Sequence, residues 1–485
     1  MNWWVLRRKI HTSWLITIFG ASFIVGISFA KSYQLDFFTN PLWVVASVLI
    51  IVIICARRYV YLVPFLLVIG IFLGLWRGNL QSNDYEKASL LGGKTVTLVG
   101  TVREDVDSDS GGNIVTILKS IKIDDTKYDG NIWVKFNTGL DIQRSDIVTV
   151  EGKIDQGFGS YIGAMYRSKL IHVSRPMPGD VALHFRDWFS EGVKESIDEP
   201  ASSLGIGYLV GQKKALPIDL IDALKIAGLT HIVVASGYNL TILVRLARRL
   251  FARISKYLAA MFSGFMIFGF VMVTGFSPSM TRAGIVASLS LLAWYYGRKF
   301  NPIVLLVFVG AMTLLINPSY AWGDLGWELS FAAFAGVMIL APLLKAYYFG
   351  DREIKFIGQV LIETISATIV TAPILIAAFG QISNVSLIAN ILILPLVPLA
   401  MLLTFIAGLG VLVLPASAIF IGKPAQWLLD YMIKVAEYLS SLPWAISKIE
   451  LSSIMVGVAY LSIVLVCIYL WRVTGYNLRE SNIVK

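Results

Sequence analysis

The amino-acid sequence predicts a polytopic α-helical membrane protein with an extracytoplasmic, all-β domain that resembles an OB-fold. We expect about ten or eleven spans, some of them broken or re-entrant. Of the 485 residues, 56% are hydrophobic and 15% are charged, whereas a soluble domain has about 25% charged residues. Apolar runs long enough to cross a bilayer recur along the chain, and residues 90–175 alternate as strands do. These observations exclude an ordinary soluble globule.

The N-terminal segment, residues 1–78, carries three predicted membrane helices. They cover Ser13–Ala30, Pro41–Ala56 and Tyr59–Trp76. Ser28-Phe29-Ala30 resembles a signal-peptidase site, but the apolar run is longer than a signal core, which favours a retained helix. The positive-inside rule places Arg57-Arg58, between the second and third helices, in the cytoplasm. The segment after the third helix is therefore predicted to lie outside the cytoplasmic membrane.

Residues 90–175 read as a small β domain. Five strands are predicted, at Thr95–Glu104, Asn113–Ile123, Asn131–Asn137, Asp146–Ile154 and Lys169–Val173. Alternation is clear in Ile132-Trp133-Val134-Lys135-Phe136, and Gly111-Gly112 and Asp129-Gly130 mark turns. Five short strands of this size indicate a small closed barrel of the OB-fold type.

Residues 180–230 are expected to be interfacial, residues 231–475 to form a second membrane domain, and residues 476–485 a tail. Asp180–Pro200 reads as an amphipathic helix with Trp188, Phe189 and Val193 on its apolar face, and Leu204–Thr230 as interfacial or re-entrant. The predicted spans that follow are His231–Leu250, Tyr257–Gly275, Ala283–Tyr296, Pro302–Ile316, Leu325–Leu344, Phe356–Ala378, Ser386–Leu414 and Ser452–Trp471. Ser386–Leu414 is too long for one simple span, and whether it is a re-entrant segment plus a helix decides the side of the C-terminus. Arg472, Arg479 and Lys485 favour a cytoplasmic end.

Cysteine and histidine usage excludes two other kinds of organisation. Cys55 and Cys467 both lie in apolar runs, which excludes a disulfide framework. The four histidines are scattered and no Cys/His cluster has zinc spacing. We therefore expect neither a metal nor a cofactor.

The string from His231 to Asn239 is the most unusual in the second membrane domain. Ser236-Gly237-Tyr238-Asn239 interrupts an apolar helix, and such a break is tolerated where backbone groups face protein or a wet cavity. Close helix packing through small residues is the alternative, and spacing alone favours it.

Ionisable side chains near or inside the predicted spans form the second set of candidates. Arg282 lies close to a membrane edge, and Asp324 and Glu328 are four residues apart on one helix. Charged groups in a membrane are costly and usually face a partner or a pathway. The alternative is that all three lie at the water interface. Glu363, with Gln359 one turn away, either lines a lumen or seals helices together.

Two enzyme motifs are rejected. Gly92-Gly93-Lys94-Thr95 looks like the end of a phosphate-binding loop, but Ala88 replaces the required glycine and a strand rather than a helix follows. Ser236 as an intramembrane protease nucleophile lacks a histidine base from another helix. The sequence therefore predicts no enzymatic activity and no catalytic residues.

Several strings, taken together and in order, resemble the ComEC family of competence proteins, and the resemblance covers nearly the whole chain. The β domain resembles the family's N-terminal OB-fold domain, which is also described as DUF4131. The matching strings are Gly228-Leu229-x-His231 with Ser236-Gly237-Tyr238-Asn239, Arg282-Ala283, Asp324-x-Gly326-Trp327-Glu328-Leu329-Ser330-Phe331, Phe379-Gly380, and Asn390 with Pro395. The chain departs from the family at Tyr238-Asn239, where Leu-His is common, and at Trp327-Glu328, where Phe-Gln is common.

The resemblance implies uptake of single-stranded DNA through the bacterial cytoplasmic (inner) membrane during natural transformation. It implies a substrate path bordered by Ser236, Gly237, Asn239, Arg282, Asp324, Glu328, Ser330 and Asn390. Arg282 would contact phosphate, while Asp324 and Glu328 would pair with Arg282 or shape a gate. Many members also carry a metallo-β-lactamase-like domain with a His-x-His-x-Asp-His motif; these 485 residues contain no such motif, so we expect no nuclease activity from it.

The OB-like domain would receive the strand, since such domains combine cationic grooves with stacking aromatics. The residues predicted to bind DNA are Lys119, Trp133, Lys135 and Phe136, and Tyr128, Tyr161 and Tyr166 are further aromatics available for stacking. Trp133 and Phe136 are equally compatible with the barrel core. Positive and negative side chains nearly cancel across residues 90–175, so no strong electrostatic funnel is predicted.

Two other functions stay open from sequence, and each has different partners. One is a secondary transporter of another polyanion or a lipid-linked substrate, and the other is a competence scaffold without a pore. The expected partners of a DNA channel are single-stranded DNA, membrane lipids, an external DNA receptor, a separate nuclease and a cytosolic helicase-like ATPase. The oligomeric state, the polarity of the strand and the pore size are left open.

The net charge of +10, from 41 Lys+Arg against 31 Asp+Glu, is mainly a topology signal. Twelve cations lie in predicted cytoplasmic loops: Arg7, Arg8, Lys9, Arg57, Arg58, Arg245, Arg248, Arg249, Arg253, Lys256, Arg298 and Lys299. Their number exceeds the net charge, so the basic balance is not a footprint of DNA binding.

Overall fold

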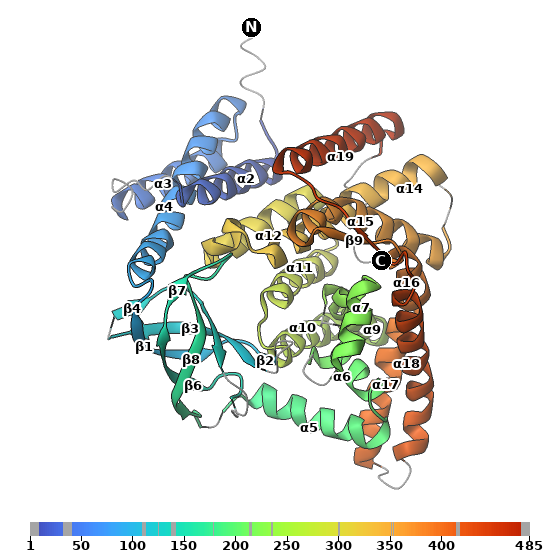
Figure 1. The fold of residues 1–485 in the computed structure, drawn as a ribbon. Coiled ribbons are helices and arrows are strands. Elements are labelled where there is room, and N and C mark those ends of the chain that lie inside the picture. The colour runs from blue at the N-terminus through green and yellow to red at the C-terminus, as the bar shows by residue number, and fades with distance from the viewer. Residues whose placement is uncertain are drawn as a thin grey trace. The chain divides into compact units, whose positions relative to one another are not determined.

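Figure 1 shows the computed structural model of the chain. The structure describes residues 9–32, 41–108, 113–124, 126–136, 142–177, 179–212, 216–233, 236–298, 301–350, 352, 354–413 and 418–476. The predicted turn at Gly111-Gly112, the tail beyond residue 476 and the cations Arg7, Arg8 and Lys299 lie outside these ranges. The chain forms two compact units. The N-terminal unit comprises Met1–Met177 and Phe300–Phe331, and the C-terminal unit comprises Pro178–Lys299 and Ala332–Lys485.

Three helices open the N-terminal unit: α2 (Thr12–Ala30), α3 (Pro41–Arg57) and α4 (Val63–Ser89). Helices α2 and α4 approach each other at glycines. A Cβ atom on Gly74 would lie 2.3 Å from the carbonyl oxygen of Phe23, and one on Gly26 would lie 2.3 Å from that of Ile71. Small residues let helix backbones come this close. Helix α4 also continues well past the predicted end at Trp76.

A segment distant in sequence completes the helical part of this unit. It consists of α12 (Pro302–Ile316), a 3-10 turn (Pro318–Trp322) and the start of α13 (Leu325–Ala335). Arg77 of α4 donates from Nε to the carbonyl oxygen of Leu315 (2.9 Å) and from Nη2 to that of Ile316 (3.0 Å). These carbonyls end α12 and have no partner within the helix, so Arg77 serves as its C-terminal cap. The Trp322 indole donates to the carbonyl oxygen of Ile27 in α2 at 3.0 Å.

The β domain is a closed barrel. Its main strands are β1 (Thr95–Val102), β3 (Ile114–Ile123), β5 (Ile132–Phe136), β6 (Ile147–Lys153) and β8 (Gly163–Ser174). They pair in the order β1-β6-β8-β5-β3, and β3 returns to β1. The β5–β8 pair is parallel and the other pairs of this ring are antiparallel. Three short strands, β2 (Asp107–Ser108), β4 (Thr126–Tyr128) and β7 (Asp155–Gln156), extend the sheet.

All five predicted strands are present, with one error of length. Strand β8 begins at Gly163 rather than at Lys169. Its first half escapes prediction because a bulge interrupts it: Val134 pairs with Met165 and Phe136 with Ser168, so Tyr166 and Arg167 together oppose Lys135. A bulge breaks the two-residue alternation on which strand prediction depends.

The core of the C-terminal unit contains a helix, α6 (Ala201–Val210), that the sequence predicts to be interfacial or re-entrant. Every residue of α6 is buried, whereas Leu204–Thr230 was expected to be interfacial or re-entrant. The helix is apolar all round, which is the pattern of a core helix. A Cβ on Gly205 would lie 2.8 Å from the Thr404 side chain of α17 (Val397–Val413). Helix α7 (Ile218–Ile226) follows as a separate helix.

The predicted amphipathic helix is α5 (Val181–Ser196), capped by Asp180, whose side chain accepts from the backbone N–H of Leu183 at 3.0 Å. Phe189 and Val193 are buried against Gly408 of α17, and Trp188 is exposed. The segment therefore is a helix with an apolar face, but two of the three predicted apolar residues pack on protein.

The second membrane block contains helices of unequal length. They are α8 (Thr230–Val233), α9 (Gly237–Phe251), α10 (Lys256–Val273), α11 (Pro278–Tyr295), α14 (Ala341–Phe349), α15 (Phe356–Phe379), α16 (Ser386–Ile393), α18 (Ala418–Ser440) and α19 (Ser453–Thr474). The helix expected over His231–Leu250 is interrupted at Ser236, whose backbone is extended and which precedes α9. The long run Ser386–Leu414 divides into α16 and α17 around a 3-10 turn at Leu394–Leu396. A π-helical segment, Gly336–Leu340, joins α13 to α14, and β9 (Gln381–Ser383) pairs with β10 (Ile446–Lys448).

Helix α18 was not predicted from sequence. It carries Lys423, Asp430, Lys434 and Glu437, and its buried residues, such as Ala425 and Leu429, form one stripe. The charged side chains lower the mean hydropathy of α18 below that of a membrane-spanning helix, so sequence does not reveal it. Its stripe of buried residues nevertheless packs into the core of the C-terminal unit.

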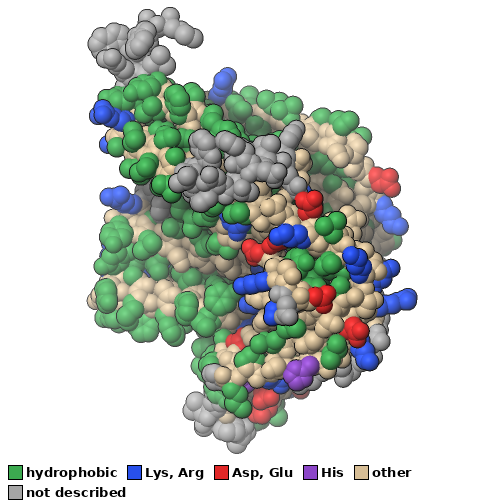
Figure 2. All heavy atoms as spheres, turned by 90° about the vertical axis from the view of Figure 1, so that its left-hand side faces the viewer, with side chains coloured by type: hydrophobic (Ala, Val, Ile, Leu, Met, Phe, Trp, Pro, Cys, Tyr) green, Lys and Arg blue, Asp and Glu red, His purple; other side chains and the backbone are tan. Residues whose placement is uncertain are grey.

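Seven helices in the described part of the chain are long and apolar enough to cross a membrane. They are Thr12–Ala30, Val60–Ser89, Lys256–Val273, Leu325–Phe349, Gly358–Phe379, Ser386–Val411 and Ser453–Thr474. Three shorter apolar helices lie at Val45–Ile54, Ala201–Val210 and Pro302–Ile316. Exposed hydrophobic side chains cover much of the upper part of the face in Figure 2, where α2–α4 lie. The protein is therefore a mostly helical, multi-pass membrane protein with an N-terminal β-barrel-like domain.

Candidate functional site

Asp324 holds together two parts of the N-terminal unit. Its Oδ1 accepts from the backbone N–H of Trp327 at 2.7 Å and so caps α13, and its Oδ2 accepts from the Ser160 hydroxyl of the barrel at 2.9 Å. A carboxylate at a helix N-terminus is stabilised by the free N–H groups and the helix dipole. Both oxygens of the predicted path residue therefore have partners within the fold.

Further hydrogen bonds surround this contact, and we call the set the barrel latch: Tyr85, Arg103, Ser160, Tyr320 and Asp324. The Tyr85 hydroxyl donates to the carbonyl oxygen of Ser160 at 2.7 Å, and Arg103 Nη2 donates to the Tyr320 hydroxyl at 2.8 Å. The two backbones also come close, because a Cβ on Gly159 would lie 3.2 Å from the carbonyl oxygen of Gly323. The latch thus joins the loop between β7 and β8 to the turn before α13.

Tyr161, beside the latch, is held as a neutral phenol. Burial, together with the nearby carboxylates of Glu104 and Asp324, raises the pKa of Tyr161 to about 12.

Glu328 and Ser330 follow Asp324 on α13, and both are partly exposed. The backbone N–H of Glu328 donates to the carbonyl oxygen of Asp324 at 3.0 Å, which places the two residues one helical turn apart. The predicted spacing of the two carboxylates is therefore present.

The unusual string of the C-terminal unit packs closely. Asn239 is 0% exposed. Its Nδ2 donates to the carbonyl oxygen of Tyr208 in α6 at 3.0 Å, and its Oδ1 accepts from the Ser236 hydroxyl at 3.3 Å. A Cβ on Gly237 would lie 3.2 Å from the Cβ of Ala283 in α11. Gly237 and Asn239 therefore take part in close helix packing, which is the second of the two interpretations offered from sequence.

Arg282 and Asn390 are buried in the same unit, each 4% exposed. Arg282 lies in the second turn of α11, directly before the alanine that Gly237 contacts. Asn390 lies on α16, and its Oδ1 has no hydrogen-bond partner among the residues that the structure describes. Glu363 of α15 accepts from Gln359 Nε2 at 2.8 Å, so these two residues pair as their spacing predicts.

The structure divides the predicted path residues between the two units. Asp324, Glu328 and Ser330 belong to the N-terminal unit, and Ser236, Gly237, Asn239, Arg282 and Asn390 belong to the C-terminal unit. Within the second group the Ser236–Asn239 string lies against α11 close to Arg282. The expected pairing of Arg282 with Asp324 or Glu328 stays a prediction.

The barrel residues predicted to bind DNA separate into surface and core. Phe136 is 1% exposed and belongs to the barrel core with Ile132 and Val134. It cannot stack on a base while the barrel is folded, which corrects that prediction, and Tyr128 is likewise a core residue. Trp133 and Lys135 are partly exposed on the other face of β5, and Lys119 is exposed on β3.

Trp133 belongs to an outer aromatic cluster that sequence reasoning found only in part. Its ring centroid lies 5.3 Å from that of Tyr166 and 5.9 Å from that of Phe158, and Phe158 lies 5.2 Å from Tyr161. Tyr166 is 49% exposed and Phe158 is 45% exposed. Phe158 was missed because it lies in a glycine-flanked loop that has no strand pattern.

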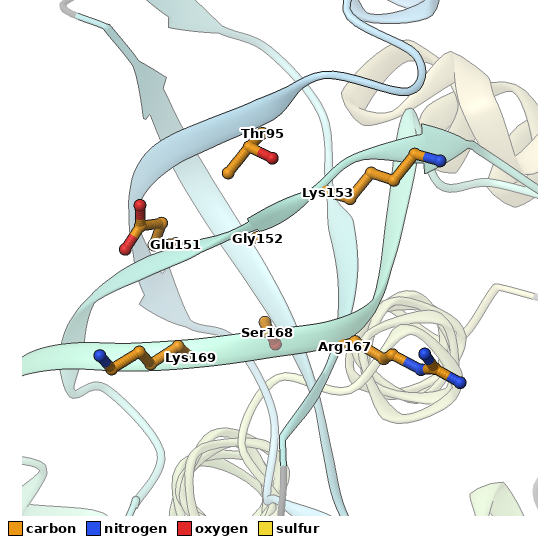
Figure 3. Close-up of a pocket in the computed structure, with 7 residues that line it drawn as sticks. All are labelled: Thr95, Glu151, Gly152, Lys153, Arg167, Ser168 and Lys169. Atoms are coloured by element: carbon orange, nitrogen blue, oxygen red, sulfur yellow. The ribbon is translucent and has the colours of Figure 1, made fainter.

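A cationic hollow lies on the outer surface of the barrel, and sequence reasoning missed it (Figure 3). It measures about 620 Å³ and is lined by Thr95, Glu151, Gly152, Lys153, Arg167, Ser168 and Lys169, from β1, β6 and β8. Lys153, Arg167 and Lys169 supply three cations against one carboxylate. Glu151 pairs with Lys169 and Gly152 pairs with Ser168 in the antiparallel β6–β8 register. The cations come together only through this register, which the sequence does not give. Arg167 adjoins Tyr166 at the bulge, which links the hollow to the aromatic cluster.

No group of three or more His, Cys, Asp or Glu side chains in the described ranges is arranged to hold a metal ion.

Comparisons with known proteins agree on one family. The Competence protein family matches residues 208–474, from within α6 to the last residue of α19. ComE operon protein 3 of Bacillus subtilis (strain 168) is 27% identical over 227 residues. That region is 45% of this chain and spans 28% of the relative's length. No solved structure matches the chain.

The family match covers more than half of the 485 residues and includes α9, α11, α13 and α16, which carry the strings singled out from sequence. The chain therefore belongs to the Competence protein family and is a ComEC-family competence protein.

Proposed function

We propose that this protein is a channel through which single-stranded DNA passes the bacterial cytoplasmic membrane during natural transformation. The observation that carries the proposal is the outer surface of the barrel, where the aromatic cluster around Trp133 and Tyr166 adjoins the cationic hollow. Stacking aromatics beside cations are the means by which proteins bind single strands without reading sequence. Membership of the Competence protein family agrees with such a role.

The barrel is proposed to be an extracytoplasmic OB-fold. Support comes from its ring of five strands with a single parallel pair, β5–β8, which matches the small Greek-key barrel of that class. Arg57-Arg58, before α4, supports the outside location, because cationic loops stay in the cytoplasm.

In the C-terminal unit, the path through the membrane is proposed to run beside Ser236, Arg282 and Asn390. In the N-terminal unit, Glu328 and Ser330 are proposed, by themselves, as further residues that contact the strand. The buried Oδ1 of Asn390 supports this choice, since a buried polar atom without a partner is costly unless something pairs with it. Asp324 enters the proposal as a residue that holds the barrel against the start of α13, which carries Glu328 and Ser330. A DNA receptor, a separate nuclease and a cytosolic helicase-like ATPase are the proposed partners.

The binding surface is tested on the full-length protein in nanodiscs with a fluorescent oligothymidylate. Tyr166→Ala should weaken binding by about 1–3 kcal/mol, roughly five- to 150-fold, because one stacking platform is lost. Arg167→Gln with Lys153→Gln should lower affinity and make the salt dependence shallower by about 0.7 per lost phosphate contact. Lys127→Gln, which removes an exposed cation from β4, is the control. Unchanged affinity and salt slope in the hollow variants would remove this surface from the proposal.

Passage is tested separately. Deletion of the gene, followed by transformation with labelled DNA, should leave label outside the cytosol. Reconstituted vesicles containing the protein should admit single-stranded DNA. If the deletion abolishes DNA uptake but the vesicles admit no single-stranded DNA, a competence scaffold without a pore is favoured. If the vesicles instead transport another polyanion or a lipid-linked substrate, the secondary transporter is favoured.

A further inference from the structure

Two cations share one tryptophan at an end of the α9–α10–α11 bundle. The guanidinium carbon of Arg248 lies 5.2 Å from the ring centroid of Trp294, and Lys256 Nζ lies 5.8 Å from the same centroid. Lys256 Nζ also lies 5.6 Å from the ring of Tyr295. Cations at these distances are attracted to the ring faces. The aromatic pair thus gathers charges from two different helices into one place.

The surroundings add charge of the same sign. Arg245 and Arg249 of α9 act electrostatically on Arg248, and Arg253 is exposed in the turn before α10. The sequence contains no Asp or Glu between Asp222 and Asp324, so none of these three helices brings an acidic side chain. Arg249, Arg253 and Lys256 are exposed, so an anionic group that approaches this end of the bundle is attracted by all three. The cluster is therefore suited to an anionic ligand.

Exposed apolar side chains lie next to these cations in the sequence, and we call them the exposed strip. Leu250 is 60% exposed and Ile254 is 70% exposed. From them the strip continues along α10 with exposed Tyr257, Met261 and Phe265. Helix α10 is one of the seven helices long and apolar enough to cross a membrane. A cationic cluster beside an exposed apolar strip matches the charged headgroup and the apolar chains of an anionic phospholipid.

We propose that Arg248, Arg249, Lys256 and Trp294 form a headgroup site for an anionic glycerophospholipid, whose acyl chains lie along the exposed strip of α10. Basic pockets between membrane helices are known to bind such headgroups. A phospholipid is favoured over a nucleic acid because the exposed side chains of α10 offer an apolar surface for acyl chains, and because two cations already lie over the Trp294 ring. This site is independent of the proposed DNA path.

The test uses the full-length protein in phosphatidylcholine nanodiscs and measures tryptophan quenching by brominated lipids. Brominated phosphatidylglycerol should quench more than brominated phosphatidylcholine at equal content. That excess should be lost in Trp294→Phe, which locates the lipid at this ring. In the double variant Arg249→Gln/Lys256→Gln, the preference of the site for phosphatidylglycerol over phosphatidylcholine, measured by this excess quenching, should fall about thirtyfold. That is the change expected for about 1 kcal/mol per cation near a membrane surface.

Two controls keep the outcome unambiguous. Lys423→Gln/Lys434→Gln removes two exposed cations from α18 and should leave the excess unchanged. Arg249→Lys/Lys256→Arg keeps both charges and should retain it, which separates loss of charge from misfolding. Equal quenching by the two lipids, or an excess that survives Arg249→Gln/Lys256→Gln, would overturn the proposal. If millimolar inorganic phosphate abolishes the excess quenching, the site binds free phosphate and the proposal is overturned. If the wild type shows no excess quenching but Arg249→Gln/Lys256→Gln loses oligothymidylate binding, the site binds nucleic acid and the proposal is likewise overturned.

Discussion

Single side chains in this protein join elements that are far apart in sequence, and Asp324 does so most directly. Its two carboxylate oxygens serve α13 and the barrel at once. Sequence singles it out because a charged group near a predicted membrane span usually faces a partner or a pathway. The structure shows that the same charge is used within the fold, as a helix cap and as the acceptor of the barrel latch.

Replacing Ser160 by Ala should loosen the latch without removing the helix cap. The hydroxyl donates to a carboxylate, and a hydrogen bond to a charged group is worth about 1.5–3 kcal/mol. We expect faster amide hydrogen exchange in the loop between β7 and β8, with exchange in α13 unchanged. Asp324→Ala should accelerate exchange in both segments, since it removes both bonds. Equal effects of the two substitutions on α13 would contradict this division of roles.

Tyr161 predicts how stability responds to alkaline pH. An unfolded tyrosine ionises near pH 10, whereas the pKa of Tyr161 in the fold is about 12. Its contribution is therefore complete below pH 10 and is lost as the pH rises from 10 to 12. Thermal unfolding of the full-length protein across this window should show a smaller loss in Tyr161→Phe than in the wild type. Parallel curves would show that Tyr161 does not titrate in this way.

At the scale of elements, the glycine contact between α2 and α4 is a sharp constraint. In Gly74→Val the side chain would meet the carbonyl oxygen of Phe23, because even a Cβ would lie at 2.3 Å. The helices must move apart, and overpacking of this kind costs about 1–3 kcal/mol or more. We expect a lower unfolding temperature in detergent. Gly264→Val on α10 is the matched control, since nothing lies within 4 Å of its added Cβ; an equal loss there would point to glycine content rather than to the contact.

Strands were predictable from sequence where alternation is regular. In β5, Ile132, Val134 and Phe136 fall on one face and Trp133 and Lys135 on the other. That same alternation could have assigned Phe136 to the core, because it shares a face with two aliphatic residues. The bulge in β8 and the loop carrying Phe158 have no such period, so the aromatic cluster and the cationic hollow depend on pairing that sequence does not reveal.

Helices were predictable where they are uniformly apolar, and not where tertiary packing decides. Helix α6 is apolar on all sides, but sequence could not tell a buried core helix from an interfacial one. Helix α18 buries a stripe while carrying charges, so its mean hydropathy hides it. The break at Ser236 was visible as polar residues in an apolar run, whereas the contact of Asn239 with Tyr208 depends on how α6 and α9 pack.

At the scale of the whole molecule, binding of DNA and its passage should be separable. Arg282→Gln changes a buried cation of the proposed path and leaves the barrel surface intact. Cells carrying it should still bind labelled DNA but should give fewer transformants, with protein abundance measured as a check. Arg352→Gln, which alters an exposed cation, should transform normally. Normal transformation by Arg282→Gln would exclude Arg282 from the path.

The membership of residues 300–331 in the N-terminal unit has a consequence for exchanging parts between homologues. A chimera that replaces only residues 1–177 would leave the donor's barrel facing the recipient's Tyr320 and Asp324, and the donor's α4 facing the recipient's α12. The unit that can be transplanted is discontinuous in the gene, so two segments must travel together. For the same reason, recombination inside either segment during evolution would be tolerated only when its counterpart changes with it.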